Sequence, residues 1–161
     1  MTTAPSGEQQ STDADVEATL VASRALLGVV ARSIAEALDV VTLPQFRVLV
    51  VLRTAGPLRM GALAERMNIN PSTFSRFVDR MVEGGWIQRK SRLESRREVL
   101  IDLTAHGAQL VDHVTHRRQR ELATILSELD PAQRRAVRRG FEVFALAAGE
   151  PSATDLLILG I

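Results

Sequence analysis

The chain has 161 residues, of which 45% are hydrophobic and 24% are charged, and its net charge of +1 is close to balance. This length predicts one core or two closely joined modules. Cysteine is absent, which excludes disulfides, cysteine-ligated zinc and thiol redox switching. Aromatic residues make up only 4%, and tyrosine is absent, which argues against a stacking platform for single-stranded nucleic acid.

The first segment, residues 1–14, is polar and acidic and predicts a disordered tail. It has neither the basic region nor the apolar stretch of a signal peptide. No uninterrupted apolar run approaches the ~20 residues that a membrane helix needs. We therefore expect a cytoplasmic protein that makes no contact with a membrane.

Residues 15–41 predict one long helix. Its apolar residues recur at helical spacing: Leu20, Leu27, Val30, Ile34 and Leu38. Leu26, Val29 and Ala37 widen this stripe beyond a single contact face. A helix that is apolar on more than one side must bury more than one side, against its own domain or against a second chain.

Two short helices are expected next. Thr42 is a plausible N-cap of the first, which carries Pro44 in its first turn and stops at Gly56. After a four-residue connection, the second runs over about residues 61–67. Both are short enough to pack as parts of one small unit.

A third short helix has clear boundaries. Asn70 is placed to cap it, Pro71 occupies its first position, and Gly84-Gly85 supplies a left-handed stop. Its inward stripe consists of Phe74, Phe77, Val78, Met81 and Val82.

The hydrophobic period then changes from about 3.6 to 2. This change predicts a two-stranded hairpin, with strands at residues 86–91 and 97–104 and a charged tip at residues 92–96. Trp86, at the start of the hairpin, is expected to pack beneath it.

Two helices complete the chain. Thr104 caps a long helix, and Asp130 starts another, with Pro131 and Gln133 in the positions of a capping box. The last helix runs to about Ala148. The apolar residues 155–161 are interpreted as dimer packing.

Short helices followed at once by a hairpin describe a winged helix-turn-helix. The expected fold is mainly α with a small β-hairpin wing, flanked by N- and C-terminal helices. The major groove of a duplex admits one α-helix, whose N-terminal part reaches the base edges. On the third helix, Ser72, Thr73, Ser75, Arg76 and Arg80 point away from the apolar stripe and offer donors and acceptors. The alternative is an ordinary solvated ion-pair face.

The hairpin carries a cluster of basic residues: Arg89, Lys90, Arg92, Arg96 and Arg97. Cationic side chains on a protruding tip can enter the minor groove, which is narrow and strongly negative in A·T-rich sequence. The alternative is a charge run that serves solubility.

Candidates for other chemistry are sparse. His113 and His116 are three apart on the long helix, a spacing that a Zn²⁺ site could use, although the adjacent arginines disfavour a cation. No phosphate loop, nucleophile elbow or paired carboxylates stand out, so we predict neither an enzyme nor a cofactor.

The stretch from Leu43 to Gly107 resembles the MarR (multiple antibiotic resistance regulator) family of bacterial transcription factors. The matching stretches are LPQFRVLVVL, GALAERMNINPSTFSRFVDRMVEGGWIQR and SRREVLIDLTAHG. With the flanking helices, the resemblance covers about residues 15–149. It implies a homodimer with intertwined terminal helices, whose two winged helices read a pseudo-palindromic operator in double-stranded DNA.

The resemblance also assigns roles and domains. Ser72, Thr73, Ser75 and Arg76 would face the major groove, and Arg96 or Arg97 the minor groove. Residues 42–103 would form the DNA-binding domain, and 15–41 and 104–161 the dimerisation helices. The family often binds a small aromatic or phenolic ligand, so we expect a repressor released by an effector.

The wing departs from the family pattern. Arg92 and Ser95 occupy positions where the family often has aspartates that brace the wing arginines. The sequence leaves two other functions open: a winged helix that binds an acidic protein partner, and a zinc-responsive regulator.

Overall fold

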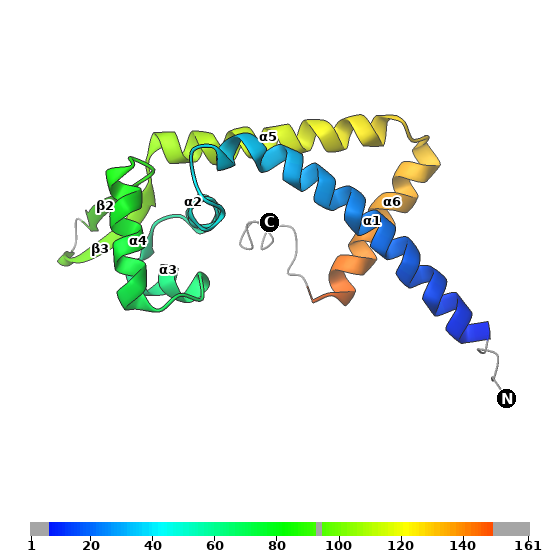
Figure 1. The fold of residues 1–161 in the computed structure, drawn as a ribbon, viewed down its shortest axis with the longest axis horizontal. Coiled ribbons are helices and arrows are strands. Elements are labelled where there is room, and N and C mark those ends of the chain that lie inside the picture. The colour runs from blue at the N-terminus through cyan, green and yellow to red at the C-terminus, as the bar shows by residue number, and fades with distance from the viewer. Residues whose placement is uncertain (1–6, 93–94, 150–161) are drawn as a thin grey trace.

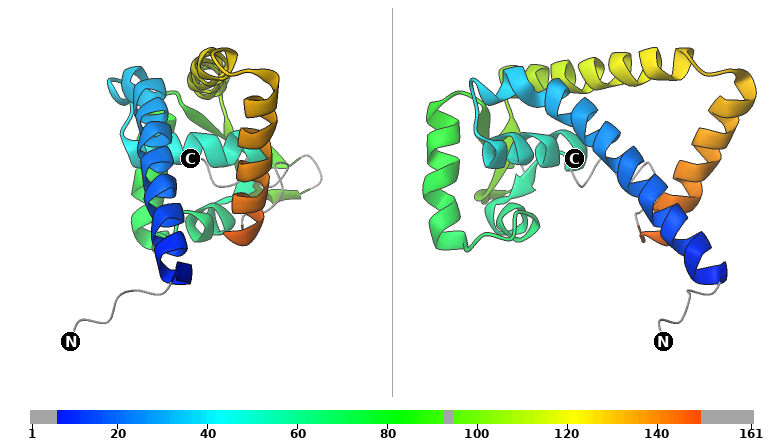
Figure 2. Two further views of the ribbon diagram at one scale, coloured as in Figure 1. Left: turned by 90° about the vertical axis from the view of Figure 1, so that its right-hand side faces the viewer. Right: turned by 45° about the vertical axis from the view of Figure 1, so that its right-hand side comes forward.

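The computed structural model describes residues 7–92 and 95–149. Its elements are, in order, α1 (Gly7–Leu38), α2 (Leu43–Ala55), β1 (Leu58–Arg59), α3 (Met60–Arg66), α4 (Pro71–Glu83), β2 (Ile87–Arg92), β3 (Ser95–Leu103), α5 (Ala105–Ser127) and α6 (Pro131–Ala147). The predicted order of one long helix, three short helices, a hairpin and two further helices is confirmed. Helices α2 to α4 and the sheet form a lobe at one end, and α1, α5 and α6 extend from it as an open frame (Figures 1 and 2).

The hydrophobic core lies inside the lobe. Its largest fully buried side chains include Leu49, Leu52, Leu63, Phe74, Met81, Ile87 and Ile101. Ile34 and Ala37 of α1 and Val111 and Val114 of α5 join the same cluster. Burying one such side chain contributes roughly 1.5–3 kcal/mol. The lobe is therefore packed directly onto the inner ends of the two frame helices.

The sheet has three antiparallel strands in the order β1-β3-β2. The hairpin predicted from the change of period is β2–β3, in which Ile87 pairs with Leu103. The sequence predicts only a connection at residues 57–60, but Leu58 pairs with Ile101 as part of β1. Two residues are too few to show a period, so this strand has no sequence signal of its own.

The boundaries of α4 follow the predicted chemistry. The side chain of Asn70 accepts a hydrogen bond from the backbone N–H of Ser72 at 3.1 Å. At the other end Gly85 has φ +73°, and the N–H of Trp86 donates to the carbonyl of Met81 at 3.0 Å. This pattern, a Schellman motif, turns the chain from α4 directly into β2.

The predicted caps of α5 and α6 are also confirmed. Thr104 Oγ1 accepts a hydrogen bond from the N–H of Gly107 at 3.1 Å. Asp130 Oδ1 accepts from the N–H groups of Ala132 and Gln133 at 2.7 and 2.9 Å. The capping box is completed by Gln133 Oε1, which accepts from the N–H of Asp130.

Helix α1 begins earlier than the sequence predicts. A disordered tail is expected over residues 1–14, but the helix starts at Gly7. Residues 8–38 contain no proline, and acidic residues near a helix N-terminus interact favourably with its dipole. Residues 1–6 and the apolar segment 155–161 lie outside the described residues.

By length and composition, the Thr12–Leu38 part of α1 would suffice to cross a membrane, although its apolar residues do not form one uninterrupted run. Core helices of soluble proteins pass the same test. Here Val29 and Ala37 are buried in the protein. Arg32 and Glu36 form ion pairs with Glu121 and Arg117 of α5. The C-terminal half of this span, from Val29 to Ala37, therefore packs against the rest of the protein.

Candidate nucleic-acid interface

Helix α4 has one buried face and one exposed face. Phe74, Val78 and Met81 are completely buried. Thr73 and Arg76 are exposed on the outer side, and Ser75 is partly buried. The amphipathic pattern of the sequence is therefore present, with Ser75 the least accessible of the predicted contact residues.

The outer face of α4 contains a shallow depression lined by Thr73, Arg76, Asp79 and Arg80. Arg76 and Arg80 are one helical turn apart. Neither forms an ion pair with any residue in the part of the chain that the structure describes. Two guanidinium groups are therefore available for an anion or for acceptors on a base edge.

Ser72 has a role that the sequence pattern does not indicate. Its hydroxyl donates a hydrogen bond to Asn70 Oδ1 at 2.9 Å, beside the backbone bond to the same oxygen. A serine hydroxyl has one proton. While this bond stands, Ser72 can only accept hydrogen bonds from another molecule.

Asp79 forms an ion pair with Arg89 of β2, which joins α4 to the wing, defined as the β2–β3 hairpin. The two residues are ten positions apart and belong to different elements. Helical spacing therefore gives no indication of the contact. A carboxylate that would otherwise repel phosphate is neutralised here by Arg89.

Lys90 makes a second ion pair at the base of the wing. Its Nζ contacts Asp102 Oδ2 on β3, while the side chain is 53% exposed. The sequence predicts Lys90 as a DNA contact but gives no sign of this partner. The other predicted wing residues, Arg92, Arg96 and Arg97, lie on β2 and β3 beside the tip, and their side chains are outside the described part.

The wing is attached to the start of α5. Trp86 is partly buried against the core, as predicted, and its ring stacks on that of His106. Thr104 Oγ1 donates to the carbonyl of Gly85 at 2.7 Å. The end of α4, the base of the wing and the beginning of α5 therefore form one junction.

The candidate metal residues are on the exposed side of α5. His113 Nε2 lies 3.4 Å from Glu36 Oε2, and Arg117 pairs with the same carboxylate. The hydrogen bond and charge of Arg117, with help from His113, lower the pKa of Glu36 below its ordinary value. No cluster of three or more His, Asp or Glu suited to a metal occurs in the described ranges. Since an arginine already neutralises Glu36, the arrangement favours an ion-pair cluster over a cation site.

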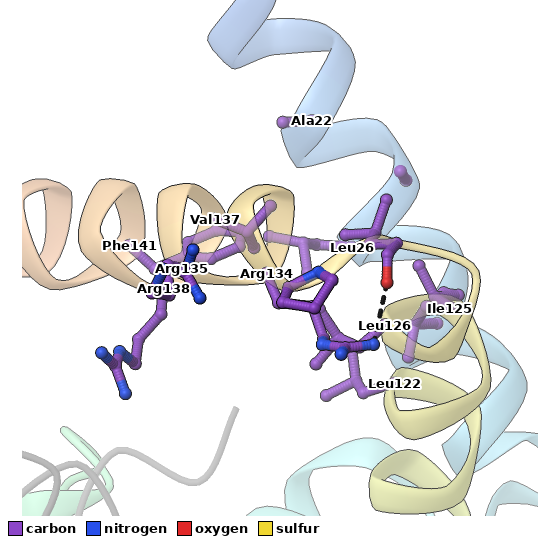
Figure 3. A pocket seen from close by; sticks show the side chains of 14 residues that line it. Ala22, Leu26, Leu122, Ile125, Leu126, Arg134, Arg135, Val137, Arg138 and Phe141 are labelled. Carbon is purple, nitrogen blue, oxygen red and sulfur yellow. Dashed lines mark hydrogen bonds between the residues drawn. The ribbon is translucent and has the colours of Figure 1, made fainter.

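A groove of about 880 Å³ lies between α1, α5 and α6. Figure 3 shows its side chains converging from these three helices. Its apolar lining residues include Ala22, Leu26, Leu122, Ile125, Val137 and Phe141, and its charged lining residues are Arg134, Arg135 and Arg138. Arg134 donates to the carbonyl of Leu129 at 2.8 Å. The groove is open and apolar, as expected for a surface that another segment covers.

Comparison with known proteins identifies the family. Residues 41–99, which contain α2 to α4 and most of the wing, match the profile of the MarR family. A solved structure of Rv1404 from Mycobacterium tuberculosis is 38% identical, covers 93% of this chain and 99% of its own, and superposes with a TM-score of 0.78. The chain belongs to the MarR family.

Two curated relatives agree with this assignment. YfiV of Bacillus subtilis, a transcriptional regulator of the helix-turn-helix type, is 27% identical over 106 residues, 66% of each chain. The alignment thus spans slightly less than two thirds of that relative's length. The multiple antibiotic resistance protein MarR of Salmonella typhimurium is 30% identical over 82 residues, 51% of this chain and 57% of its own. The winged-helix fold of this MarR-family member is that of a DNA-binding transcriptional regulator.

Proposed function

We propose that this MarR-family regulator is a homodimeric repressor that reads a pseudo-palindromic operator. The observation that carries the proposal is the outer face of α4, where Arg76 and Arg80 lie beside Thr73 without an ion pair to any described residue. A helix that enters the major groove needs donors and acceptors near its N-terminal end, with little bulk. This face meets that requirement.

The proposed roles differ from residue to residue. Arg76 donates two hydrogen bonds to guanine O6 and N7 or binds a phosphate. Arg80, one helical turn further along α4, binds a phosphate of the DNA backbone. Thr73 and Ser75 contact base edges or phosphates, and Ser72 accepts a hydrogen bond while it donates to Asn70.

The wing would supply the second set of contacts, through Lys90, Arg92, Arg96 and Arg97. We assign Arg96 or Arg97 to the minor groove and the remaining cations to phosphates. Lys90 is held by Asp102, so its contact with a phosphate requires either a shared or a broken ion pair.

A second copy of the chain is the proposed occupant of the groove between α1, α5 and α6. Large apolar side chains stand exposed along these helices, with Leu27 at 66% and Leu146 at 81%. Soluble monomers rarely leave apolar surface of this extent in water. Residues 15–41 and 104–161 would thus act as dimerisation segments, and 42–103 as the DNA-binding domain.

Charge supports the same assignment. The groove is lined by Arg134, Arg135 and Arg138, while every charged residue between Glu8 and Glu17 is acidic. An acidic α1 from a second copy would complement this arginine-lined surface. Intertwining of the terminal helices would bring the two together.

Release of DNA is proposed to follow binding of a small aromatic or phenolic effector between the lobe and the dimer helices. The lobe is tied to the frame by Arg53, which donates to Asp112 of α5 at 2.9 Å. This contact raises the pKa of the Arg53 guanidinium. A ligand that altered this junction would change the spacing of the two α4 helices from the ~34 Å repeat of the groove. Such a regulator acts in the cytoplasm, where the operator is.

The experiment compares binding to a duplex from upstream of the protein's own gene with binding to a scrambled duplex, over a salt series. Specific binding tighter by a factor of ~10³ or more, falling steeply with salt, is expected. Failure to bind either duplex at low salt would contradict the proposal and favour a protein partner. Adding phenolic compounds or Zn²⁺ to the complex then tests the effector directly.

A further inference from the structure

Asp79 lies among three arginines but forms an ion pair with only one of them. Arg76 precedes it by three residues on the same helix, and Arg80 follows it directly. Both line the same depression as Asp79. The partner that it holds is Arg89, which comes from β2.

The alternative pairing of Asp79 is with Arg76. Residues three apart on a helix are neighbours on its surface, and an aspartate and an arginine at this spacing attract each other. Such a pair would occupy the Arg76 guanidinium, and it would leave a carboxylate in the middle of the basic face. Both effects would oppose the approach of a polyanion. By engaging Asp79, Arg89 removes both.

The geometry of the sheet sets the direction of Arg89. On β2 it is paired across the sheet with Ile101, which is fully buried, whereas Lys90 is paired with Leu100. Side chains alternate between the two faces of a strand. Arg89 therefore leaves the sheet on the face toward the core and α4, while Lys90 leaves on the other face and meets Asp102.

The pair is placed where it can act on recognition. The Asp79 side chain is 45% exposed and that of Arg89 is 42% exposed, so neither is fixed inside the core. The contact lies beside the depression that contains Arg76 and Arg80. Loss of the pair would thus change the charge of the outer face without opening a cavity.

We propose that Arg89 is a positioning residue for DNA recognition, which holds Asp79 so that Arg76 stays unpaired and free for DNA. This inference rests on the proposed function, in which α4 reads the operator. It assigns a role in recognition to a wing residue that need not touch the nucleic acid. It also makes Asp79 a competitor of DNA for the Arg76 guanidinium, and Arg89 keeps this competitor occupied.

The test is a suppression experiment on the full-length protein with the upstream and scrambled duplexes. Arg89→Gln releases Asp79 onto Arg76 and should weaken operator binding about tenfold or more. It should also reduce the slope of log affinity against log salt concentration by about the amount that one phosphate contact contributes. Asp79→Asn alone should bind at least as tightly as the wild type. The double variant should regain most of the affinity that Arg89→Gln loses, and Arg89→Lys should retain it.

Arg139→Gln is the matched control, because it removes one exposed arginine from α6, at the opposite end of the molecule from α4 (Figure 1). Its affinity for the operator should equal that of the wild type. Thermal melting of each variant checks that the fold is intact.

Two results would overturn the inference while leaving the proposed function in place. A double variant as weak as Arg89→Gln would mean that Arg89 itself contacts DNA. Equal losses of affinity and thermal stability in both single variants would mean that the pair is only a structural link. A wild type that binds neither duplex at low salt would instead overturn the proposed function, and the inference with it.

Discussion

Trp86 stacks on His106 with ring centroids 4.3 Å apart and ring planes 24° apart. Trp86 follows the end of α4, and His106 is in the first turn of α5. The contact therefore connects the helix proposed to read DNA with the long helix of the frame. Since aromatic stacking and the Thr104 bond to Gly85 act at the same junction, a shift of α5 would be transmitted to α4.

Of the glycines at this junction, Gly107 has the least room for a side chain. A Cβ at this position would lie 2.2 Å from the Trp86 carbonyl oxygen, which is backbone and cannot rotate away. We expect Gly107→Ala to reduce the free energy of unfolding by about 1–3 kcal/mol, because the start of α5 must move off the wing. Chemical denaturation followed by circular dichroism measures this loss.

Gly61→Ala is the control for that variant. Gly61 is an exposed residue of α3, and a Cβ there would meet nothing within 4 Å. Alanine is the better helix former, so this change should be neutral or stabilising by up to ~1 kcal/mol. Equal destabilisation by the two substitutions would show that the contact of Gly107 with Trp86 is not responsible.

Phe141 tests the proposed dimer surface. It lines the groove, and its side chain is 46% exposed in the single chain. If a second copy covers the groove, Phe141→Asp buries a charge and should shift the protein from dimer to monomer. Sedimentation or light scattering measures the mass. Val99 is an equally exposed apolar residue in the wing, and the Val99→Asp variant should stay dimeric. If both variants are dimers, this surface is not the dimer interface.

The ion pair of Glu36 should make the stability of the fold depend on pH. Its pKa is lowered from 4.5 in the folded chain, chiefly by the hydrogen bond from Arg117. A depressed carboxylate pKa contributes stability that is present above the unfolded value and is lost as the pH falls through the folded value. The melting temperature of the wild type should therefore be higher than that of Glu36→Gln at neutral pH, and this difference should shrink below about pH 4.5. Glu65→Gln, at an exposed position of α3, should show no such trend, and a constant difference for Glu36→Gln would contradict the assignment.

Asn70 should contribute to stability more than to recognition. Its side chain caps α4 by accepting from the N–H of Ser72. Asn70→Ala should reduce the free energy of unfolding by about 1 kcal/mol, the usual loss for a removed N-cap. Thr73→Ala, one turn into the exposed face, should leave stability unchanged and weaken DNA binding. Reversal of these two effects would refute the division of roles.

Local signals in the sequence predicted much of the fold. Asn70 and Gly85 define the ends of α4, because capping and positive φ are properties of single residues and their near neighbours. The buried Phe74 and the change of period at Trp86 follow from patterns inside one element. Such signals do not depend on which elements pack against the segment.

Contacts between distant residues could not be predicted in the same way. The pairing of Asp79 with Arg89 and of Lys90 with Asp102 depends on the register of the sheet against α4. The sequence identified these residues only as members of a charged set. Strand β1 exists because β3 offers it a free edge, which no pattern within Leu58–Arg59 reveals.

The central claim, that a dimer reads an operator through the outer face of α4, is tested most directly by selection from a pool of random duplexes followed by sequencing. This selection works wherever in the genome the operator lies. The account predicts enrichment of a pseudo-palindrome whose half-sites are centred about one helical turn apart, with Arg76→Ala relaxing the preference at defined positions of each half-site. Recovery of no common sequence, or of a motif that Arg76→Ala leaves unchanged, would contradict it.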